Sequence, residues 1–557
     1  MAERIHLRIR EYKTWQGRRG RLTERDALLI VYPDQLNQPD APPLRALRSF
    51  CEKHLKGVVS SLHLLPFFPY SSDDGFAVIN YREVKPELGT WEDVRALGDS
   101  FCLMFDLVIN HISSQSHWFQ AFLQDDPRYK DYFTTVEDER DLSAVTRPRT
   151  TPLVTNFSTS IGSKRLWTTF SRDQIDLNYR NPDVLLEMID VLLFYVGQGA
   201  QIIRLDAIAY LWKEIGTPCV HLPQTHRLVQ LLRSVLDLAA PEVMLITETN
   251  VPHPQNVTYF GDGLNEAQLV YNFALPPLVL HALLTESSQL LAAWLVDLDL
   301  PSGDVTFLNY LASHDGVGLS GVRGILPESE IDWLIDKVTE RGGLVSYKRD
   351  AEGEKAYELN VNYFDALGTP GAPEPESLHL ERFITAHAII LAIRGVPALY
   401  FHSLFGSRGW PEGVQQIGHN RAINRQKLPL SQVEFDLADP TSLRSRVFSR
   451  LSRMLQVRRS NAAFHPSGPQ KVVEGNDSVL ALLRTSPSGH ERVLCLHNVS
   501  GQPATFDLDP RTVFGDFETA DHLRDILSGG RIPIMSNSSL ALGPYETLWL
   551  GQSRRNP

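Results

Sequence analysis

The sequence predicts an α/β fold, a (β/α)8 TIM barrel with two loop-insertion subdomains and a C-terminal antiparallel β domain. Three observations predict it. Eight short apolar runs alternate with stretches of helical spacing, which is typical of parallel βα units. Two long polar blocks interrupt this alternation, and long loops at strand ends are common in such barrels. Beyond about residue 465 the pattern changes to short β-rich runs separated by turn residues.

The expected barrel strands are apolar runs that stop at proline, glycine or polar residues. The first reads ALLIVY and stops at Pro33-Asp34, and the second reads VVSSLHLL and stops at Pro66. In chain order we expect strands at 27–32, 58–65, 101–110, 201–205, 243–248, 267–273, 305–311 and 398–401. Helical spacing predicts helices at 44–55, 91–97, 184–197, 226–239 and 379–394. Strands of the C-terminal domain are expected at 478–483, 492–498, 504–508 and 546–551.

These patterns divide the chain into five parts. A charged N-terminal extension of helical character comes first, and the barrel follows it. The two polar blocks form insertion subdomains after the third and seventh strands, and the β domain ends the chain. We expect the extension at 1–26, the barrel at 27–111 and 173–465, the insertions at 112–172 and 316–362, and the β domain at 466–557.

Composition excludes several classes of protein. The chain has 557 residues, a net charge of −12 and 22% charged residues, which is ordinary for a globular protein. No basic tract stands out, so we expect no nucleic-acid partner and no anionic membrane surface. The four cysteines lack disulfide or zinc spacing, which favours a reducing cytoplasm. The N-terminus has no apolar signal core, and no apolar run approaches the ~20 residues of a membrane span.

The stretch Gln201–Tyr210, which reads QIIRLDAIAY, places Arg204 and Asp206 two residues apart at the end of an apolar strand. Residues i and i+2 of a strand share one face, so the two charges should meet. Burying both is costly unless they pair. A cation this close should lower the pKa of Asp206 and keep it ionised, as a nucleophile must be. A purely structural ion pair would give the same pattern, and this stretch alone leaves both interpretations open.

Other acidic residues follow neighbouring strands. Glu248 follows the fifth expected strand and Asp315 the seventh, with His111 and His314 beside these ends. One such carboxylate could be a helix cap or a surface charge. Three on one barrel rim are hard to explain as caps, because like charges repel and a fold tolerates that mainly for function.

Two carboxylates that flank one bond are the arrangement of glycosidases. Asp206 would be the nucleophile, and Glu248 the general acid, because its apolar strand should raise its pKa by desolvation. Asp315 would hold sugar hydroxyls and favour the oxocarbenium-like transition state. A covalent intermediate implies retention of configuration, with the carboxyls of the first two about 5–5.5 Å apart.

Four motifs carry a family resemblance. DLVINH (106–111), RLDA (204–207), ITET (246–249) and ASHD (312–315) resemble, in order, the signature regions of the α-amylase superfamily. The motifs SSDDGF (71–76), NFALPPLVLHAL (272–283) and HNRAINR (419–425) resemble its sucrose phosphorylase branch. Within that branch, DLSAVTRPR (141–149), LWTTFSRDQIDLNYR (166–180) and VNYFDAL (361–367) resemble the glucosylglycerate phosphorylases. Sucrose 6-phosphate and glucosylglycerol phosphorylases are close cousins of that group.

The resemblance implies a set of sugar-binding residues. The side chains that would hold the glucosyl unit are Asp73, His111, Arg204, His314, Asp315 and Arg421. Phe76 and Phe170 would wall its pocket, although ordinary loop packing explains both rings equally well. Tyr210 would line the pocket near the nucleophile. Superfamily members often bind calcium at the position of Asn110, but this branch generally needs no metal, so we expect no metal and no cofactor.

The resemblance further implies a retaining α-glucoside phosphorylase that converts 2-O-α-glucosylglycerate and inorganic phosphate to α-glucose 1-phosphate and glycerate. Phosphate favours arginine, whose planar fork binds two oxygens. Arg147, Arg149 and Arg408 are candidates, of which Arg149 is the best positional match, while solvated loop charges remain an alternative for the other two. The same guanidinium could hold the glycerate carboxylate in turn.

Several alternatives stay open at this point. Sucrose 6-phosphate, sucrose or glucosylglycerol could be the substrate, because the loop at 401–414, where acceptor specificity should be set, departs from the group's pattern. A hydrolase or transglucosidase would use the same carboxylates. A non-catalytic homologue usually lacks one of them, and this chain keeps all three. The sequence leaves a monomer and a homodimer equally open.

Overall fold

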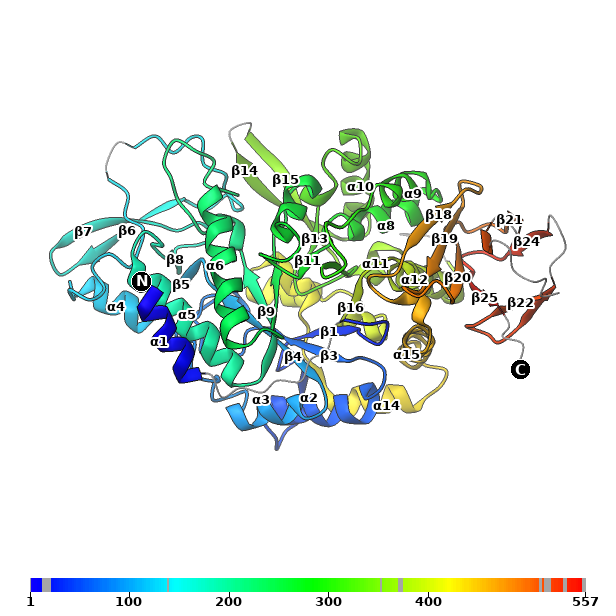
Figure 1. Cartoon of the computed structure of the whole chain (residues 1–557), viewed down its shortest axis with the longest axis horizontal. Coiled ribbons are helices and arrows are strands. Elements are labelled where there is room, and N and C mark those ends of the chain that lie inside the picture. The colour runs from blue at the N-terminus through cyan, green and yellow to red at the C-terminus, as the bar shows by residue number, and fades with distance from the viewer. Residues whose placement is uncertain are drawn as a thin grey trace.

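The computed structural model describes residues 2–12, 22–137, 140–350, 353–368, 374–509, 513–514, 522–533 and 538–552. Figure 1 shows a central barrel, with the insertion that carries β6 and β7 at one end of the molecule and the C-terminal sheets at the other. Helices α2, α3 and α14 lie along one side of the barrel, and the hairpin β14–β15 stands on the opposite side.

Eight parallel strands close into a barrel, which confirms the predicted fold class. The order around the barrel is β1-β16-β12-β11-β10-β9-β4-β3, so the first and last strands meet. All eight expected strands are present: β1 (Leu28–Val31), β3 (Ser61–Leu64), β4 (Cys102–Val108), β9 (Ala200–Asp206), β10 (Met244–Thr247), β11 (Leu269–Tyr271), β12 (Thr306–Asn309) and β16 (Val396–Tyr400). Their side chains are almost all buried, which explains why they appear in the sequence as continuous apolar runs.

The five expected helices are also present, and two of them begin at side-chain caps. Thr90 and Asp93 form a capping box at the start of α3, and Asn181 followed by Pro182 starts α5. The five are α2 (Pro43–Phe50), α3 (Trp91–Gly98), α5 (Pro182–Gly197), α6 (Pro223–Ala239) and α12 (Glu376–Ala392). The structure adds α7 (His253–Asn256), α8 (Leu275–Thr285), α9 (Gln289–Val296), α11 (Tyr363–Ala366), α13 (Pro411–Ile417), α14 (Leu430–Ala438) and α15 (Leu443–Arg459).

The N-terminal helix α1 (Ala2–Tyr12) packs against α5 and α6. Its residues Ile5 and Ile9 are buried there. Arg4 and Arg8 reach α5, with nitrogen–oxygen distances of 2.6 Å to Asp183 and 2.7 Å to Asp190. The expected helical extension is therefore present over this range, and residues 13–21 of it lie outside the described residues.

Both insertions hold more regular structure than their polar sequences suggested. The first contains α4 (His117–Leu123) and the hairpin of β6 (Val154–Thr159) and β7 (Gly162–Trp167), with β5 (His111–Ser113) paired to β8 (Gln174–Asp176). The second contains α10 (Glu328–Glu340) and a three-stranded sheet of β13 (Val317–Gly318), β15 (Gly353–Asn360) and β14 (Leu344–Asp350). Short strands β2 (Leu36–Asn37) and β17 (Leu428–Pro429) pair near the barrel.

The C-terminal part is an antiparallel β structure, as predicted. One sheet has the order β18-β19-β20-β25-β22-β23, and β21 pairs with β24. The strands are β18 (Gln470–Val473), β19 (Val479–Thr485), β20 (Arg492–Asn498), β21 (Ala504–Leu508), β22 (His522–Asp525), β23 (Arg531–Pro533), β24 (Ser538–Leu542) and β25 (Thr547–Gln552). Trp549 and Cys495 face the barrel side of this sheet, because both belong to the main hydrophobic core.

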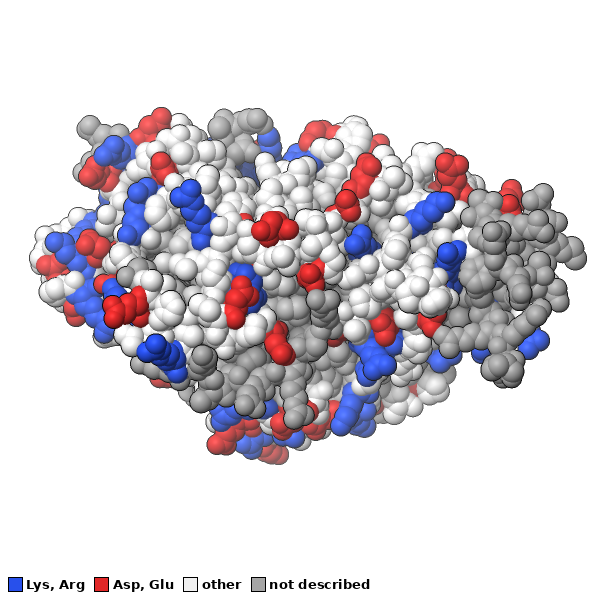
Figure 2. All heavy atoms as spheres, in the orientation of Figure 1, with Lys and Arg blue, Asp and Glu red and all other residues white. Residues whose placement is uncertain are grey.

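Charge on the molecule is mixed. Figure 2 shows basic and acidic side chains interspersed over the described part of the visible face, without a large patch of one sign. Among the described helices, none combines the length and the apolar character that crossing a membrane requires.

The seam where β1 meets β16 is held by one buried arginine. Arg458, on α15, is 1% exposed, and its hydrogen-bond acceptors among the described residues are all backbone carbonyls. Its acceptors are Glu24 and Asp26 before β1, Leu391 and Gly395 before β16, and Phe464 before the β domain, at 2.6 to 3.2 Å. Burial lowers the pKa of Arg458 to about 10, so it remains charged at neutral pH. One side chain therefore joins both ends of the barrel to the following domain.

We expect Arg458→Met to destabilise the protein by about 3 kcal/mol or more, because several buried carbonyls lose their donor. The midpoint of urea unfolding, followed by intrinsic fluorescence, measures the loss. Arg453→Met, an exposed position on the same helix, is the control and should shift the midpoint little. Equal midpoints for the two variants would show that the seam does not depend on Arg458.

Candidate active site

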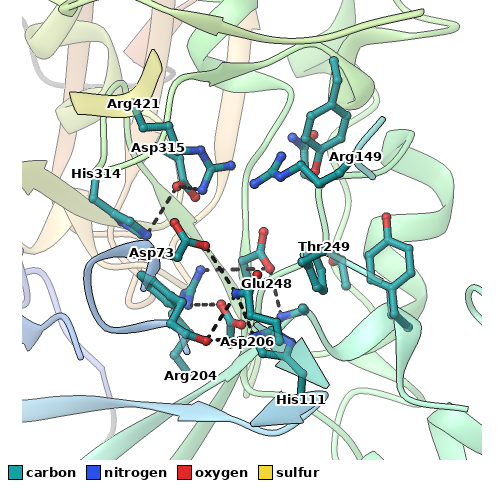
Figure 3. A pocket seen from close by; sticks show the side chains of 18 of the residues that line it. Asp73, His111, Arg149, Arg204, Asp206, Glu248, Thr249, His314, Asp315 and Arg421 are labelled. Atoms are coloured by element: carbon teal, nitrogen blue, oxygen red, sulfur yellow. Dashed lines mark hydrogen bonds and ion pairs between the residues drawn. The ribbon is translucent and has the colours of Figure 1, made fainter. Parts of the chain in front are cut away.

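A pocket opens at the carboxyl ends of the barrel strands, where such folds place their sites. Nearly all the residues named from the sequence line it together. Its lining consists of Asp73, Phe76, His111, Arg149, Phe170, Gln174, Arg204, Asp206, Ala207, Ala209, Tyr210, Glu248, Thr249, Asn250, Val251, His314, Asp315, Tyr357 and Arg421. Figure 3 shows Asp206, Glu248 and Arg204 at its centre, His314, Asp315 and Arg421 on one side, and Arg149 on the other. Of the site residues and anion-binding candidates named from the sequence, Arg147 and Arg408 are missing from this lining.

Arg204 is the buried cation at the base of the pocket. One of its nitrogens lies 2.5 Å from an oxygen of Asp106 and 2.7 Å from an oxygen of Asp206. Its other terminal nitrogen lies 4.0 Å from Glu248. Asp106, which is fully buried on β4, also contacts the ring of His63 at 2.7 Å. A single guanidinium is therefore shared by three carboxylates.

This sharing corrects the expectation that the pKa of Asp206 is lowered. Burial raises the pKa of Asp206 to about 6, because desolvation and the nearby charge of Asp106 outweigh the attraction of Arg204. Burial likewise raises the pKa of Glu248 to about 7, with Arg204 opposing the shift and Asp206 adding to it. The pKa of Glu248 is thus raised, as the sequence predicted. The two carboxyls are coupled, so the pair releases its protons in two steps, and between these steps one carboxyl is ionised while the other is protonated.

The turn after β9 orients the two carboxyls. Ala207 adopts a left-handed conformation with φ of 50°, which is unfavourable for a residue with a side chain. Its backbone N–H donates to Glu248 Oε2 at 3.0 Å. The residue next to Asp206 therefore fixes the side chain of Glu248, so one strained backbone position sets the relation between the two acids.

Asp315 lies at the opposite side of the pocket among positive charges. Arg421 forms an ion pair with it, and Arg425 approaches the same oxygen at 3.5 Å. Burial would raise the pKa of Asp315, but Arg421 and the other cations lower it far below the usual range. The third carboxylate is therefore ionised at any physiological pH.

Aromatic rings and histidines complete the pocket wall. Phe76 stacks on His314 with ring centres 5.0 Å apart and planes 8° apart. Phe170 meets Tyr210 edge to face, with centres 5.7 Å apart. His111 contacts the carbonyl oxygen of Phe76 at 2.9 Å, and burial lowers its pKa. Both phenylalanines thus face the pocket while packing against its other wall residues.

Asp73 is presented by a strained turn. Asp73, Asp74 and Gly75 all have positive φ values, of 53°, 47° and 112°. A side chain at Gly75 would place its Cβ 2.7 Å from Pro66, so only glycine fits there. Arg425 holds the turn by donating to Asp74 at 2.6 Å.

A buried ammonium group occupies the region of Asn110. Lys213 lies 2.7 Å from Asn110 Oδ1 and 2.7 Å from Asp176 Oδ2. Asp176 also accepts from the backbone and hydroxyl of Thr169, at 2.8 and 2.6 Å. The polar atoms of Asn110 and Asp176 are therefore satisfied by protein groups, and a lysine supplies the positive charge.

The three candidate arginines for anions have different surroundings. Arg149 lines the pocket, and no carboxylate in the described part of the chain forms an ion pair with it. Arg147 folds back onto the carbonyl oxygens of Thr150 and Thr151. Arg408 is 57% exposed and pairs with Asp365 at 2.8 Å, outside the pocket. The structure brings only Arg149 to the site.

Sequence reasoning missed several residues of the site. Asp106 carried a detectable signal, a carboxylate inside an apolar strand, and Arg425 lay within a motif that had been noted. Gln174, Asn250 and Tyr357 line the pocket without a signal of their own. Tyr357 comes from the second insertion, and its position depends on how that insertion folds back.

Comparison with known proteins agrees with this geometry. Residues 53–299 match the family model of the alpha-amylase catalytic domain. The chain is 51% identical to a glucosylglycerate phosphorylase of Spirochaeta thermophila over 95% of this chain and 90% of the relative. It is 45% identical to a glucosylglycerate phosphorylase of Escherichia coli over 96% of this chain and 93% of the relative.

Among solved structures, the crystal structure of sucrose 6F-phosphate phosphorylase from Thermoanaerobacter thermosaccharolyticum aligns with a TM-score of 0.75. The alignment has 25% sequence identity and covers 85% of this chain and 94% of that one. The resemblance inferred from the motifs is thereby confirmed. The chain belongs to the sucrose phosphorylase branch of the α-amylase superfamily, in the group of the glucosylglycerate phosphorylases.

Proposed function

We propose that this protein is a retaining glucosyl phosphorylase that converts 2-O-α-glucosylglycerate and inorganic phosphate reversibly to α-glucose 1-phosphate and glycerate. One observation carries the proposal. Asp206 and Glu248 flank a single guanidinium, and the same pocket contains Arg149, an arginine without a carboxylate partner among the described residues. The carboxylates suit glucosyl transfer, and the free arginine suits an anionic acceptor.

In the first half-reaction, Asp206 attacks the anomeric carbon of the glucosyl unit. Glu248 donates its proton to the glycosidic oxygen, glycerate leaves, and a β-glucosyl ester of Asp206 remains. The raised pKa of Glu248, about 7, supports its role as acid. Asp315 would bind ring hydroxyls as an ionised acceptor, together with Asp73 and His314.

In the second half-reaction, phosphate replaces glycerate and one of its oxygens attacks the anomeric carbon, which breaks the bond from that carbon to Asp206. Glu248, now a carboxylate, accepts the proton of the attacking phosphate, and Asp206 is released. Two inversions give net retention, so the product is α-glucose 1-phosphate. No metal or cofactor has a part in this scheme.

Arg149 would serve both anions in turn. Its guanidinium can bind the carboxylate of glycerate in the first step and two oxygens of phosphate in the second. The relatives with the higher identities quoted above bear the name glucosylglycerate phosphorylase, which supports glycerate over an uncharged acceptor.

We also propose that the five-part division of the chain given above describes its domains, and that the enzyme acts in the cytoplasm.

We expect the purified protein to release glucose 1-phosphate from 2-O-α-glucosylglycerate only when phosphate is present. Ion chromatography of the products measures this directly. Parallel reactions with glucosylglycerol, sucrose and sucrose 6-phosphate are the comparison, and each should react much more slowly. If any of these three substrates reacts faster than glucosylglycerate, the assignment of glycerate as the acceptor is wrong. If free glucose forms equally fast without phosphate, the protein is a hydrolase.

The kcat/KM for glucosylglycerate should follow a bell-shaped pH profile. It should rise as pH increases through about 6 and fall through about 7, as the coupled pair of Asp206 and Glu248 loses its first and then its second proton. Initial rates at fixed phosphate across this range give the curve. With α-glucosyl fluoride, whose leaving group needs no proton, the Glu248→Gln variant should keep the acidic limb and lose the basic one. If the basic limb persists in Glu248→Gln with this substrate, the limb does not report the proton of Glu248.

Arg149→Met should raise the KM for phosphate about tenfold or more, since a charge-assisted hydrogen bond is worth about 1.5–3 kcal/mol. The KM for glucosylglycerate should rise with it, because its glycerate carboxylate loses the same partner. Steady-state kinetics with each substrate varied in turn provide both constants. Arg408→Met, at an arginine outside the pocket, is the matched control and should leave both near wild type. Constants that change equally in the two variants would contradict a specific role for Arg149.

A further inference from the structure

Arg421 is held by two carboxylates from different parts of the chain. Glu358, 2% exposed, accepts from Arg421 through both of its oxygens, at 3.0 Å from Nε and 2.6 Å from one terminal nitrogen. The other terminal nitrogen of Arg421 pairs with Asp315. Each of the three guanidinium nitrogens thus contacts a carboxylate, two of them Glu358 and the third Asp315.

The position of Glu358 relative to Asp315 is set by strand register. Strand β13 starts two residues after Asp315 and pairs with β15, where Gly318 lies opposite Glu358. A Cβ at Gly316 would lie 2.8 Å from Cγ of Glu358, so glycine is required for this approach. The backbone therefore brings Glu358 to Arg421 independently of any substrate.

The same hairpin also reaches the loop that carries Arg149. Arg349, on β14, exchanges both backbone hydrogen bonds with Arg147, at 2.9 and 3.0 Å. Tyr357, next to Glu358 on β15, lines the pocket. The hairpin β14–β15 therefore lies between two arginines of the pocket, one of which it neutralises while it holds the backbone beside the other.

This arrangement decides which arginine is available to an anion. A guanidinium edge with two nitrogens matches the oxygens of phosphate or carboxylate. Glu358 occupies that edge of Arg421, whereas the described structure places no carboxylate on Arg149. Without the charge of Glu358, Arg421 would offer a second anion site next to Asp315, on the side of the pocket away from Arg149.

We propose that Glu358 is a positioning residue of the reaction: it keeps Arg421 directed at Asp315 and unavailable to anionic substrates, so that phosphate and glycerate bind at Arg149. The inference rests on the proposed function, because it assumes that the pocket receives anions. It assigns the second insertion a role in substrate specificity, which neither the sequence motifs nor the pair of Asp206 and Glu248 indicated.

The Glu358→Gln variant tests this role, because it keeps the size of the side chain and removes its charge. We expect kcat for phosphorolysis to fall about tenfold to a hundredfold as Asp315 loses its fixed partner. We expect the KM for phosphate to fall about threefold or more, because Arg421 now attracts phosphate in a nonproductive position. A general loss of structure would not lower kcat and at the same time lower the KM for phosphate.

Glu354→Gln, an exposed position on the same strand, is the matched control and should keep both constants near wild type. Glu358→Asp retains the charge, so its KM for phosphate should stay near wild type, with a turnover between wild type and Glu358→Gln; this variant also decides the question if Glu358→Gln fails to fold. If the KM for phosphate rises in Glu358→Gln, or if both constants stay within twofold of wild type, the inference is wrong. A wild-type protein without phosphorolysis would instead overturn the proposed function itself.

Discussion

The shared guanidinium of Arg204 governs the chemistry of the pocket. It is buried, contacts Asp106 and Asp206 directly, and lies 4.0 Å from Glu248. One cation does not stabilise three desolvated carboxylates equally. Asp106, which His63 and Arg204 stabilise against the cost of burial, keeps a lowered pKa, whereas those of Asp206 and Glu248 rise to about 6 and 7. The pKa values of Asp206 and Glu248 are therefore raised mainly by burial, which the shared cation offsets only in part.

On the side of the pocket that carries Asp315, charges are also paired, but there each cation is compensated. Arg421 and Arg425 are committed to Asp315, Glu358 and Asp74, so their charges are compensated inside the protein. These contacts join the strained turn at Asp73, the seventh barrel strand and the second insertion into one frame. Arg149 differs because the described residues place no carboxylate against it. Among the described arginines that line the pocket, Arg149 is therefore the one that no carboxylate compensates.

Prediction from sequence succeeded where one local pattern decides the structure. The alternation of eight apolar runs with helical stretches predicts the barrel, and the two-residue period of a strand predicts the contact of Arg204 with Asp206. It failed where distant segments meet. The pKa of Asp206 depends on Asp106 from another strand, and the place of Glu358 depends on the register of β13 with β15, which no local pattern contains. Arg408 resembled a site residue by its loop, but Asp365 holds it outside the pocket.

The charge of the acceptor can be argued from the same balance. If the leaving group were uncharged, Arg149 would lose its water in the donor complex without gaining a partner, and it would gain one only when phosphate entered. Desolvating an unpaired cation is costly, so such an enzyme would bind its donor weakly. With glycerate, a carboxylate meets Arg149 in one half-reaction and phosphate meets it in the other, and the cation is compensated in both. An enzyme that exchanges one anion for another at a single arginine therefore needs no rearrangement of charge between its two steps, which is the physical reason to prefer glycerate over glycerol or fructose.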